Sequence, residues 1–484
     1  MPKPFQRIRE AAIDGRTQNV YYRQSQLERL RNVLVQNEEA LQQAIVNDSG
    51  NSVTEAKIEY GLALLALKDQ YASLNPAAAL EEEYAITHGK DAPQRTEGAG
   101  IVYIVPTAHT LLYSIIAPLC AAIAAGNCVI VELEQTTREV PSLLRRLLAA
   151  ALDVDTFDIT SSRTADAEFR AQCLEVLQEG SQDVPKSTQL VSPSQARVVA
   201  VVDRTANLEE AAKAIVTARF SFGGKSPYAP DVVLVNEFSK KAFMTAVVKE
   251  SIDLLTTENG SVGKGDSRRK QEGRKLLDEV RDSDLARIVT TGANGAILDV
   301  EKRGSDILHR KINECCLAVH SVKSLDDAID FANRNDDLLA SYTFATPATA
   351  KYLSQFLHSY VSFVNHVPME MLVGPAAPLN HPVSSSIRYP ASLFTVPRPQ
   401  YVTLSPRSSL IKQTLPTASS VVLTQLLEEA RADLSIDKKR PERVAVGFFE
   451  QGIITGLSFV LVSTLAGLGT LGYFGTRMVR TRFL

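Results

Sequence analysis

The chain has 484 residues and a formal net charge of −3, with 45% hydrophobic and 22% charged residues. This length and balance are typical of a globular protein of two or three domains, and the charge argues against a nucleic-acid partner. The five cysteines have neither disulfide nor zinc-site spacing, which indicates a reducing compartment and excludes a disulfide-stapled secreted domain. The N-terminal segment lacks an apolar core, so no secretory signal is predicted.

The first third of the chain is predicted to alternate between helices and short buried strands. A leucine- and isoleucine-rich face at helical spacing predicts one long helix from Tyr21 to Asn47. The elements predicted after it are a helix at Val53–Leu74, a strand at Ile101–Val105, a helix at Leu111–Ala125, a strand at Cys128–Val131 and a helix at Glu139–Leu152. Apolar strands that alternate with helices at this spacing predict a parallel sheet covered on both faces.

The same alternation continues in the middle of the chain. The elements predicted there are strands at Val198–Asp203, Val232–Asn236, Arg287–Thr290 and Leu317–Val322, with helices at Leu208–Arg219, Lys240–Leu255 and Leu325–Asn333. Asp266–Lys275 is dense in charge and is interpreted as a solvated helix face. Pro397–Ser420 is rich in proline, serine and threonine, which predicts a loop or linker, and Val421–Ala432 is predicted to be a short helix. The fold class predicted for the chain is therefore α/β.

The C-terminal end contains a long uncharged stretch. No charged side chain occurs from Gln451 to Thr476, and Arg477, Arg480 and Arg482 follow. A helix that crosses a bilayer needs about 20 mostly apolar residues, so residues 451–476 are predicted to form a single membrane-spanning helix. Without an N-terminal signal, we expect the body of the protein to stay in the cytosol. Basic residues flank both ends of the stretch, so they do not decide its orientation.

Several stretches together resemble the aldehyde dehydrogenase superfamily, in particular its class 3 branch of fatty aldehyde dehydrogenases. They are YRQSQLERLRNVLVQNEEAL near the start, PLCAAIAAGNCVIV at 118–131, VVDRTANLEEAAKAIVTARFSFGGKSPYAPDVVLV at 201–235 and SLDDAIDFANRNDDLLASYTFA at 324–345. Their order and spacing match the family over most of residues 20–400. The predicted C-terminal membrane helix of this chain also resembles the C-terminal anchor of the membrane-bound members of this branch.

The resemblance implies a domain layout for the whole chain. It comprises a Rossmann-type cofactor region at 1–205, a catalytic-domain-like region at 206–365, a return to the first domain with an oligomerisation segment at 366–410, a linker with a short helix at 411–450 and the membrane helix at 451–476. The resemblance also implies NAD(P) as the cofactor and a dimer as the assembly. The dimer is a homodimer or a heterodimer with an active homologue.

At the family's catalytic turn this chain departs from the pattern. The reaction needs a cysteine thiolate that attacks the aldehyde carbon, and the family's cysteine follows a Gly-Gln-Thr-like turn and precedes Val-Ala-Pro-Asp. The matching residues 224–231 read GKSPYAPD, which places Pro227 at the nucleophile position and Ser226 next to it. Proline has neither a nucleophile nor an N–H group. The resemblance therefore implies that the attacking group and the backbone half of the oxyanion hole are both lost.

The other positions of the family's site have changed as well. His109 stands at the place of the oxyanion asparagine, Glu132 at the place of the lysine that grips the cofactor ribose, and the general-base glutamate would fall near Pro193. Residues 155–190 lack the glycine-rich phosphate turn, and the motif for the second ribose, expected near residues 310–314, is absent. These departures weigh against retained NAD(P) binding. Four histidines without metal-ligand spacing predict no metal site: His320, His358, His366 and His381.

Three functions stay open at this point. The first is a membrane-anchored pseudoenzyme of this family that binds a ligand or a partner subunit. The second is an active NAD(P)-dependent aldehyde dehydrogenase, for which Cys315 and Cys316 are the cysteines nearest the relevant region. The third is a hydrolase on the same fold that uses Ser226 and His109, because a serine beside a histidine is the start of a hydrolytic site.

Overall fold

The structure is a computed structural model that describes residues 4–180, 185–256, 275–282, 286–292, 295–335, 337–417, 420–432 and 448–483. The chain divides into two units, one comprising Met1–Thr346 with Leu353–Thr403 and the other Pro347–Tyr352 with Leu404–Leu484. The domain limits expected from the sequence stay a prediction.

A five-stranded parallel sheet forms the first part of the larger unit. Its strand order is β4-β3-β2-β5-β6, and all neighbouring pairs are parallel. The strands are β2 (Ile101–Val105), β3 (Cys128–Glu132), β4 (Phe157–Thr160), β5 (Leu174–Gly180) and β6 (Gln189–Pro193). From β2 the chain adds β3 and β4 toward one edge of the sheet, and it then returns to place β5 and β6 on the other side of β2. The order therefore reverses between β2 and β5, as in doubly wound dinucleotide-binding folds.

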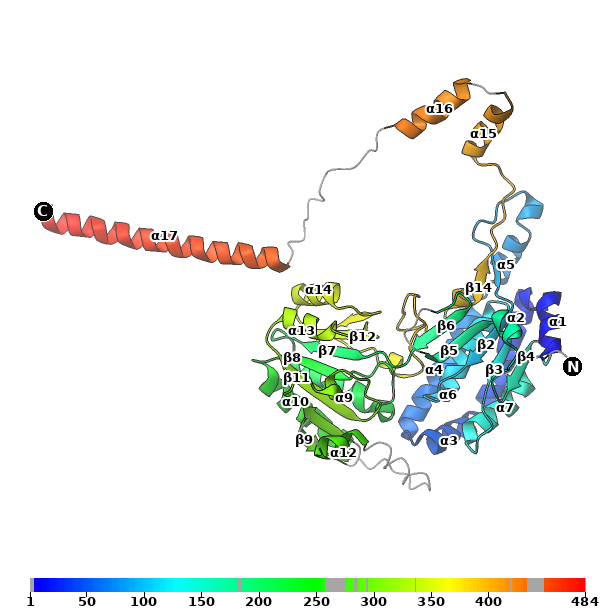
Figure 1. Ribbon diagram of the computed structural model, residues 1–484, viewed down its shortest axis with the longest axis horizontal. Coiled ribbons are helices and arrows are strands. Elements are labelled where there is room, and N and C mark those ends of the chain that lie inside the picture. The colour runs from blue at the N-terminus through cyan, green and yellow to red at the C-terminus, as the bar shows by residue number, and fades with distance from the viewer. Residues whose placement is uncertain are drawn as a thin grey trace. The chain divides into compact units, whose positions relative to one another are not determined.

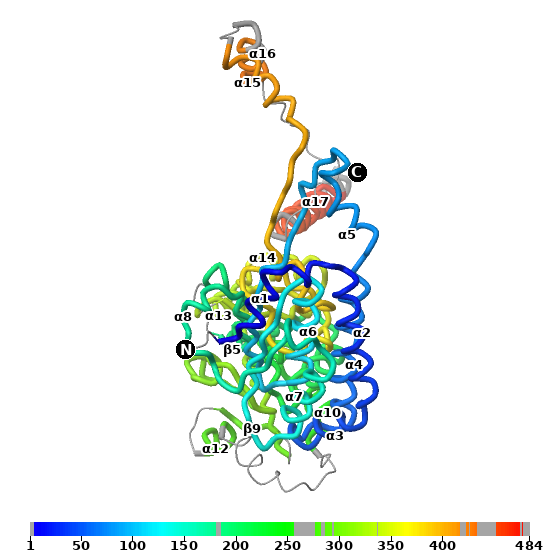
Figure 2. Tube along the Cα trace, turned by 90° about the vertical axis from the view of Figure 1, so that its right-hand side faces the viewer, coloured from blue at the N-terminus to red at the C-terminus, as the bar shows by residue number. Residues whose placement is uncertain are grey.

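Helices cover both faces of this sheet because successive strand residues point to opposite sides. The helices are α1 (Gln6–Asp14), α2 (Val20–Gln36), α3 (Glu38–Ser49), α4 (Val53–Ser73), α5 (Pro76–Glu83), α6 (Leu111–Ala124), α7 (Glu139–Ala151) and α8 (Ala167–Ala171). Ile101 and Tyr103 of β2 pack toward α1, whereas Val102 and Ile104 join the main core with α4 and α6. In Figure 2, α2 and α4 run side by side at the blue, N-terminal end of the chain.

A seven-stranded sheet forms the second part of the same unit (Figure 1), and its strand order is β13-β12-β7-β8-β11-β10-β9. The strands are β7 (Val198–Val202), β8 (Val232–Asn236), β9 (Arg287–Thr291), β10 (Ala296–Asp299), β11 (Cys316–Val322), β12 (Ala340–Phe344) and β13 (Ser362–Val364). All pairs are parallel except β9 with β10. The accompanying helices are α9 (Leu208–Phe220), α10 (Lys240–Thr256), α12 (Lys275–Asp282) and α13 (Leu325–Ala332). The next helix in the chain, α14 (Pro347–Phe356), begins with the Pro347–Tyr352 segment that belongs to the smaller unit. A small ribbon pairs β1 (Thr96–Gly98) with β14 (Thr395–Pro397). One core cluster joins residues of both large sheets.

Two local predictions differ from the structure. The long first helix is interrupted at Asn37, where α2 ends, α3 begins and the Asn37 side-chain amide donates to the Val33 carbonyl oxygen (2.8 Å). An asparagine side chain competes in this way with the helical backbone. Part of the predicted linker is also helical, with α15 (Pro406–Thr417) before α16 (Ser420–Arg431). Residues 266–274 of the predicted charged helix face lie outside the described residues.

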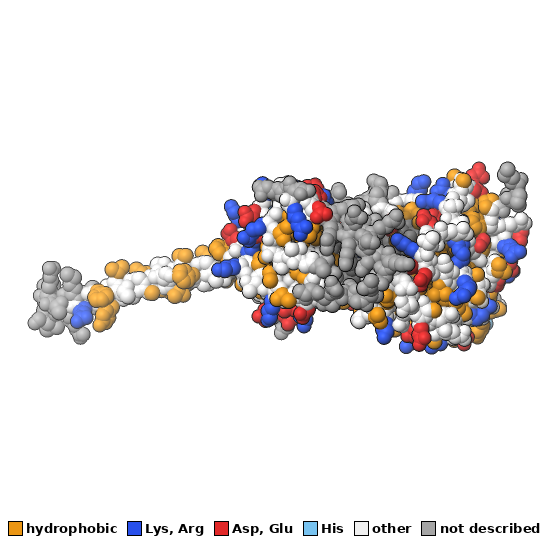
Figure 3. Space-filling view, turned by 90° about the horizontal axis from the view of Figure 1, so that it is seen from below, with side chains coloured by type: hydrophobic (Ala, Val, Ile, Leu, Met, Phe, Trp, Pro, Cys, Tyr) orange, Lys and Arg blue, Asp and Glu red, His pale blue; other side chains and the backbone are white. Residues whose placement is uncertain are grey.

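The smaller unit contains one long apolar helix, α17 (Phe448–Phe483). Its Gly452–Phe474 stretch is a candidate membrane span with a mean hydropathy of 1.8, and its side chains are exposed. On the face drawn in Figure 3 the helix carries hydrophobic side chains without acidic ones. The uncharged stretch predicted at 451–476 therefore coincides with a helix that is long enough to cross a bilayer.

Candidate functional site

The turn that carries Pro227 begins with a left-handed backbone segment at the end of α9. Phe222, Gly223 and Gly224 have φ values of 51°, 65° and 66°. Glycine adopts this region freely, but a phenylalanine there is strained. The Phe222 N–H donates to the Glu55 carboxylate of α4 over 2.6 Å, which holds the strained residue in place. The turn is therefore fixed by a residue from the first part of the unit.

Pro227 lies inside the protein, and its environment is that of a structural residue. It is buried, and its carbonyl oxygen accepts a 2.6 Å hydrogen bond from the Lys311 ammonium. Lys311 lies within the stretch where the family's second ribose motif was expected. Its side chain points to the turn and to Asp231 (3.0 Å). Burial lowers the pKa of Lys311, and the Asp231 carboxylate opposes that shift.

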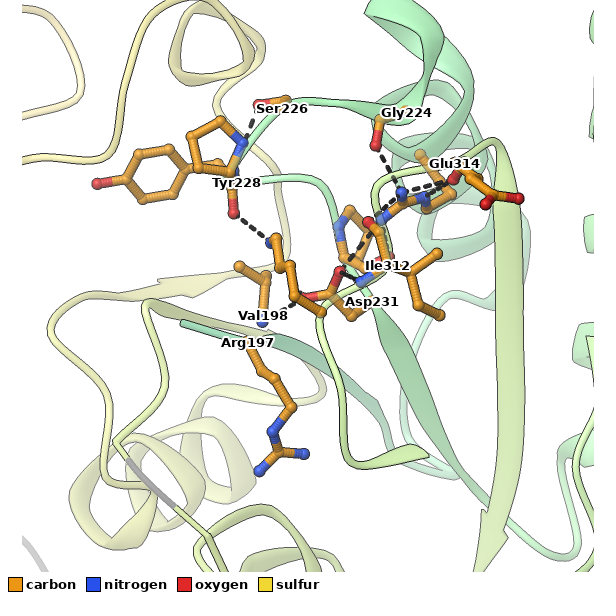
Figure 4. A network of polar contacts seen from close by, with 12 residues as sticks. Arg197, Val198, Gly224, Ser226, Tyr228, Asp231, Ile312 and Glu314 are labelled. Atoms are coloured by element: carbon orange, nitrogen blue, oxygen red, sulfur yellow. Dashed lines mark hydrogen bonds and ion pairs between the residues drawn. The ribbon is translucent and has the colours of Figure 1, made fainter. Parts of the chain in front are cut away.

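A buried cluster of three charges fastens this turn (Figure 4). Arg219, which is fully buried, pairs with Asp231 at 3.3 Å. The Arg219 guanidinium also donates to the carbonyl oxygens of four residues: Gly224, Pro230, Ile312 and Glu314. Asp231 in turn accepts from the Val198 and Ile312 amides at 2.7 and 3.0 Å. We name Arg219, Asp231 and Lys311 the Asp231 cluster.

His109, at the family's oxyanion position, lies next to the turn. Its ring packs edge-on against Phe222 with centroids 6.3 Å apart, and its Nε2 hydrogen bonds to the Leu372 carbonyl oxygen at 2.9 Å. The carbonyl can only accept, so Nε2 carries the proton. The pKa of His109 is lowered to about 4, mainly by burial and to a smaller extent by the positive charges of Lys225 and Arg388, while the hydrogen bond to the Leu372 carbonyl oxygen opposes the shift. The ring is therefore neutral at physiological pH and its donor already has a partner.

The structure does not join Ser226 to His109 by a hydrogen bond. Ser226 is fully buried, and its hydroxyl oxygen accepts from the Tyr228 amide at 3.3 Å. The general-base position near Pro193 falls at the end of β6, and Pro193 itself is buried. These positions supply no nucleophile with an adjacent base. The geometry gives the serine hydrolase hypothesis no support.

The two cysteines of the second hypothesis lie at the start of β11, and Cys315 reaches the turn. The Cys315 sulfur lies 3.8 Å from the Phe220 carbonyl oxygen as a weak donor. Burial raises the pKa of Cys315 to about 11 and that of Cys316 to about 12. A catalytic thiol needs a lowered pKa, because the thiolate is the nucleophile. Cys316 is a buried core thiol and Cys315 is partly buried, and neither has the lowered pKa of a catalytic thiol.

At the carboxyl end of the five-stranded sheet, carboxylates stand where a dinucleotide would approach. Glu179, near the end of β5, accepts from the Thr107 hydroxyl at 2.7 Å and from the Ala108 amide at 3.3 Å. Glu132, at the end of β3, accepts from the Tyr103 hydroxyl at 2.9 Å. Dinucleotides bind in doubly wound sheets at the reversal between strands, here between β2 and β5. Carboxylates at this place repel a pyrophosphate.

The helix N-termini that could receive phosphate are also unavailable. The N-terminus of α6 follows β2, and there the Glu59 carboxylate of α4 accepts from the Leu112 amide at 3.0 Å. The connection between β5 and β6 covers only residues 181–188. A parallel crossover that contains a helix needs about a dozen residues or more, and this connection is shorter than that.

Known proteins can now be compared with this geometry. Residues 5–167 match the sequence profile described as "Aldehyde dehydrogenase family". The chain contains an aldehyde dehydrogenase family domain. Mouse "Aldehyde dehydrogenase family 3 member B1" is 25% identical over 379 residues, which are 70% of this chain and 77% of that protein.

Solved aldehyde dehydrogenase structures have the same fold. The substrate-bound state of Staphylococcus aureus AldH superposes with a TM-score of 0.64 at 20% identity, covering 86% of this chain and 98% of that one. The glyceraldehyde-3-phosphate dehydrogenase GapN of Methanocaldococcus jannaschii, complexed with NADP, superposes with a TM-score of 0.62 at 14% identity, covering 82% of this chain and 92% of that one. The α/β aldehyde dehydrogenase fold expected from the sequence is therefore confirmed.

The aldehyde dehydrogenase fold implies an NAD(P) site, but the residues present fit it poorly. Glu132 stands where the family resemblance places a lysine, Glu179 accepts from the Thr107 and Ala108 donors, and Glu59 accepts at the N-terminus of α6. Each change adds negative charge or removes a donor where a phosphate would bind. No step is therefore assigned to a nicotinamide.

Sequence reasoning missed the residues that organise the site: Glu59, Arg219, Asp231, Lys311 and Arg388. The available signals were slight. Asp231 directly precedes the apolar run Val232–Val235 of strand β8, and Arg219 lies in the mostly apolar last turns of α9. A charge next to such residues is a candidate for burial, but only the tertiary structure supplies its partner.

Proposed function

We propose that this protein is a membrane-anchored aldehyde dehydrogenase homologue that binds a ligand or a partner subunit without oxidising an aldehyde. The observation that carries the proposal is Pro227 at the nucleophile position. Its turn is held by buried ion pairs, and no thiol with a lowered pKa lies beside it. Removing a single oxyanion donor typically lowers the rate about 100- to 1000-fold, and here the nucleophile is lost as well.

The proposal includes weak or absent NAD(P) binding, a body in the cytosol and a dimeric assembly. The carboxylates at the end of the five-stranded sheet support the first part, and the apolar helix α17 supports the membrane attachment. The assembly, as a homodimer or with an active homologue, rests on family resemblance. Size determination in detergent, with mass spectrometry of copurifying chains, tests that part.

We expect no saturable NADH binding and no aldehyde-dependent NADH formation by the full-length protein in detergent. Titration to about 1 mM covers the usual range of cofactor and substrate affinities. The Pro227→Cys variant is expected to stay inactive, because the restored thiol would still face a closed cofactor crevice. NADH fluorescence and absorbance at 340 nm check both statements.

An active aldehyde dehydrogenase of the intact family, assayed in parallel, is the positive control. Aldehyde oxidation that disappears in the Cys315→Ala plus Cys316→Ala double variant would establish the active-enzyme alternative. Saturable NADH binding without turnover would contradict only the part of the proposal that concerns the cofactor.

Deleting residues 448–484 is expected to convert a membrane-bound protein into a soluble one. The Gly452–Phe474 stretch is the candidate span, and a helix of this length in hydrocarbon holds the protein effectively irreversibly. Flotation of vesicles after alkaline carbonate extraction measures the effect. If the deleted form still floats with membranes to the same extent, attachment through α17 is wrong.

A further inference from the structure

Two short helices precede α17 in the smaller unit, and they leave apolar side chains uncovered. The helices α15 (Pro406–Thr417) and α16 (Ser420–Arg431) are each 12 residues long and pack against each other (Figure 1). Four of their aliphatic side chains are between 38% and 78% exposed: Ile411, Leu415, Leu423 and Leu427. Isolated helices of this length are marginal in water, because most helical stability comes from burying an apolar face. The pair therefore needs a surface that covers these side chains.

The apolar residues of each helix occur at the spacing of one helical face. In α16, Leu427 follows Leu423 by four residues, and Leu426 falls on the same side. In α15, Leu415 follows Ile411 by the same interval. A short amphipathic helix of this kind is typical of segments that lie in a membrane interface, with the apolar face toward the acyl chains.

The charged side chains of the two helices nearly balance. The basic ones are Arg407, Lys412 and Arg431, and the acidic ones are Glu428 and Glu429. Arg407 and Glu429 also pair with each other at 3.5 Å. An anionic lipid surface attracts segments with a clear excess of lysine and arginine, which these helices lack. The chemistry of the pair therefore fits a surface without net charge.

The chain itself keeps a bilayer within reach of the two helices. Only residues 432–451 separate α16 from the candidate span Gly452–Phe474. A connection of this length extends at most about 70 Å, so contact with the bilayer is an intramolecular event at high effective concentration. Residues 406–432 contain no aromatic side chain. Protein interfaces derive most of their binding energy from aromatic and arginine side chains, and leucine is rare among those residues.

We propose that the apolar face of α15 and α16 lies on the zwitterionic surface of the bilayer that α17 crosses. The inference rests on the membrane attachment in the proposed function and adds a second, peripheral contact to it. Amphipathic helices bind a membrane surface reversibly, whereas a spanning helix does not release. The contact therefore supplements α17 and does not replace it, and alkaline carbonate still releases the form that lacks residues 448–484.

The chain contains no tryptophan, so a single introduced tryptophan reports on this contact without background. The full-length protein is reconstituted into phosphatidylcholine vesicles with or without brominated acyl chains, which quench tryptophan on contact. Leu415→Trp and Leu423→Trp are expected to lose at least about half of their fluorescence, because the apolar face of an interfacial helix enters the acyl-chain boundary. Glu428→Trp, on the opposite side of α16, and Phe238→Trp, exposed in the larger unit, are the matched controls and are expected to keep theirs.

Leu461→Trp, in the middle of the candidate span, separates this inference from the attachment on which it rests. Quenching of Leu461→Trp without quenching of Leu415→Trp and Leu423→Trp would overturn the inference and leave the attachment standing. An unquenched Leu461→Trp would instead refute the attachment itself. Blue-shifted but unquenched emission from Leu415→Trp and Leu423→Trp would show that protein covers the face, and quenching that requires added phosphatidylserine would show an anionic surface. Either result would contradict the proposal.

Discussion

Asp231→Asn is expected to destabilise the protein by about 3–5 kcal/mol, because it removes the only anion of the Asp231 cluster. Arg219 and Lys311 would then be two buried cations without a counter-charge, at side-chain exposures of 0% and 3%. The new side chain keeps one oxygen, so its NH2 group would face one of the two backbone amides, Val198 or Ile312, that now donate to the carboxylate. Urea unfolding of the full-length protein in detergent measures the loss.

Glu81→Gln is the control for this substitution. Glu81 pairs with Lys90 at 3.1 Å, but both side chains are more than 60% exposed, so the expected change is within about 0.5 kcal/mol. Lys311→Met, which keeps the Arg219–Asp231 pair, is expected to have a smaller effect than Asp231→Asn. A loss below about 1 kcal/mol in Asp231→Asn would mean that the cluster does not hold the turn.

The stability of the protein is expected to fall between pH 4.5 and pH 7 through the ionisation of Glu59. Burial raises the pKa of Glu59 to about 7 from 4.5, although the amides of Leu112 and Tyr113 oppose the shift. Below pH 4.5 the carboxyl is protonated in both states, and above pH 7 it is ionised in both. Between these values only the unfolded state loses its proton, so stability decreases by about 3 kcal/mol as the pH rises.

Glu59→Gln isolates this effect, since the amide keeps an acceptor for the α6 N-terminus and does not titrate. The difference in unfolding free energy between wild type and variant is expected to change over this pH range, while Glu39→Gln, on the surface, gives a flat difference. The difference is needed because the lowered pKa of His109, about 4, acts in the opposite direction and reduces stability as the pH falls below 6.5. A flat Glu59→Gln difference would refute the raised pKa.

Part of the fold could be predicted from local patterns. Strands β2, β3, β7 and β8 are short, mostly apolar runs that are buried on both faces. The helices that follow such strands in the chain carry apolar residues at helical spacing. Composition misled the prediction at α15. There Ser405 accepts from the Ser408 amide at 3.2 Å, and Pro406 takes the first helical position. A Ser-Pro pair is a helix start as well as a loop signal.

For the candidate site, the sequence predicted only which of the family's chemical groups are missing. Pro227, His109 and Glu132 are visible as departures from a family pattern, because a change of residue type removes a chemical group wherever the side chain points. Their present contacts were not predictable. Lys311 lies in the stretch where the resemblance leads one to expect a cofactor motif, whereas the structure directs its ammonium to the Pro227 carbonyl oxygen. Burial by elements distant in the chain decides that direction.

The sequence alone determined the alternation of strands and helices and the apolar C-terminal helix, since both patterns lie in short stretches of the chain. It also determined that residue 227 has no thiol, because that is a matter of residue identity. The tertiary structure decided which charges are buried and which of them are neutralised. Arg219 has Asp231 and Arg388 has no carboxylate among the described residues, although both are arginines beside apolar or aromatic residues in the sequence. Burial and pairing arise when segments far apart in the chain exclude water together, and no local pattern specifies them.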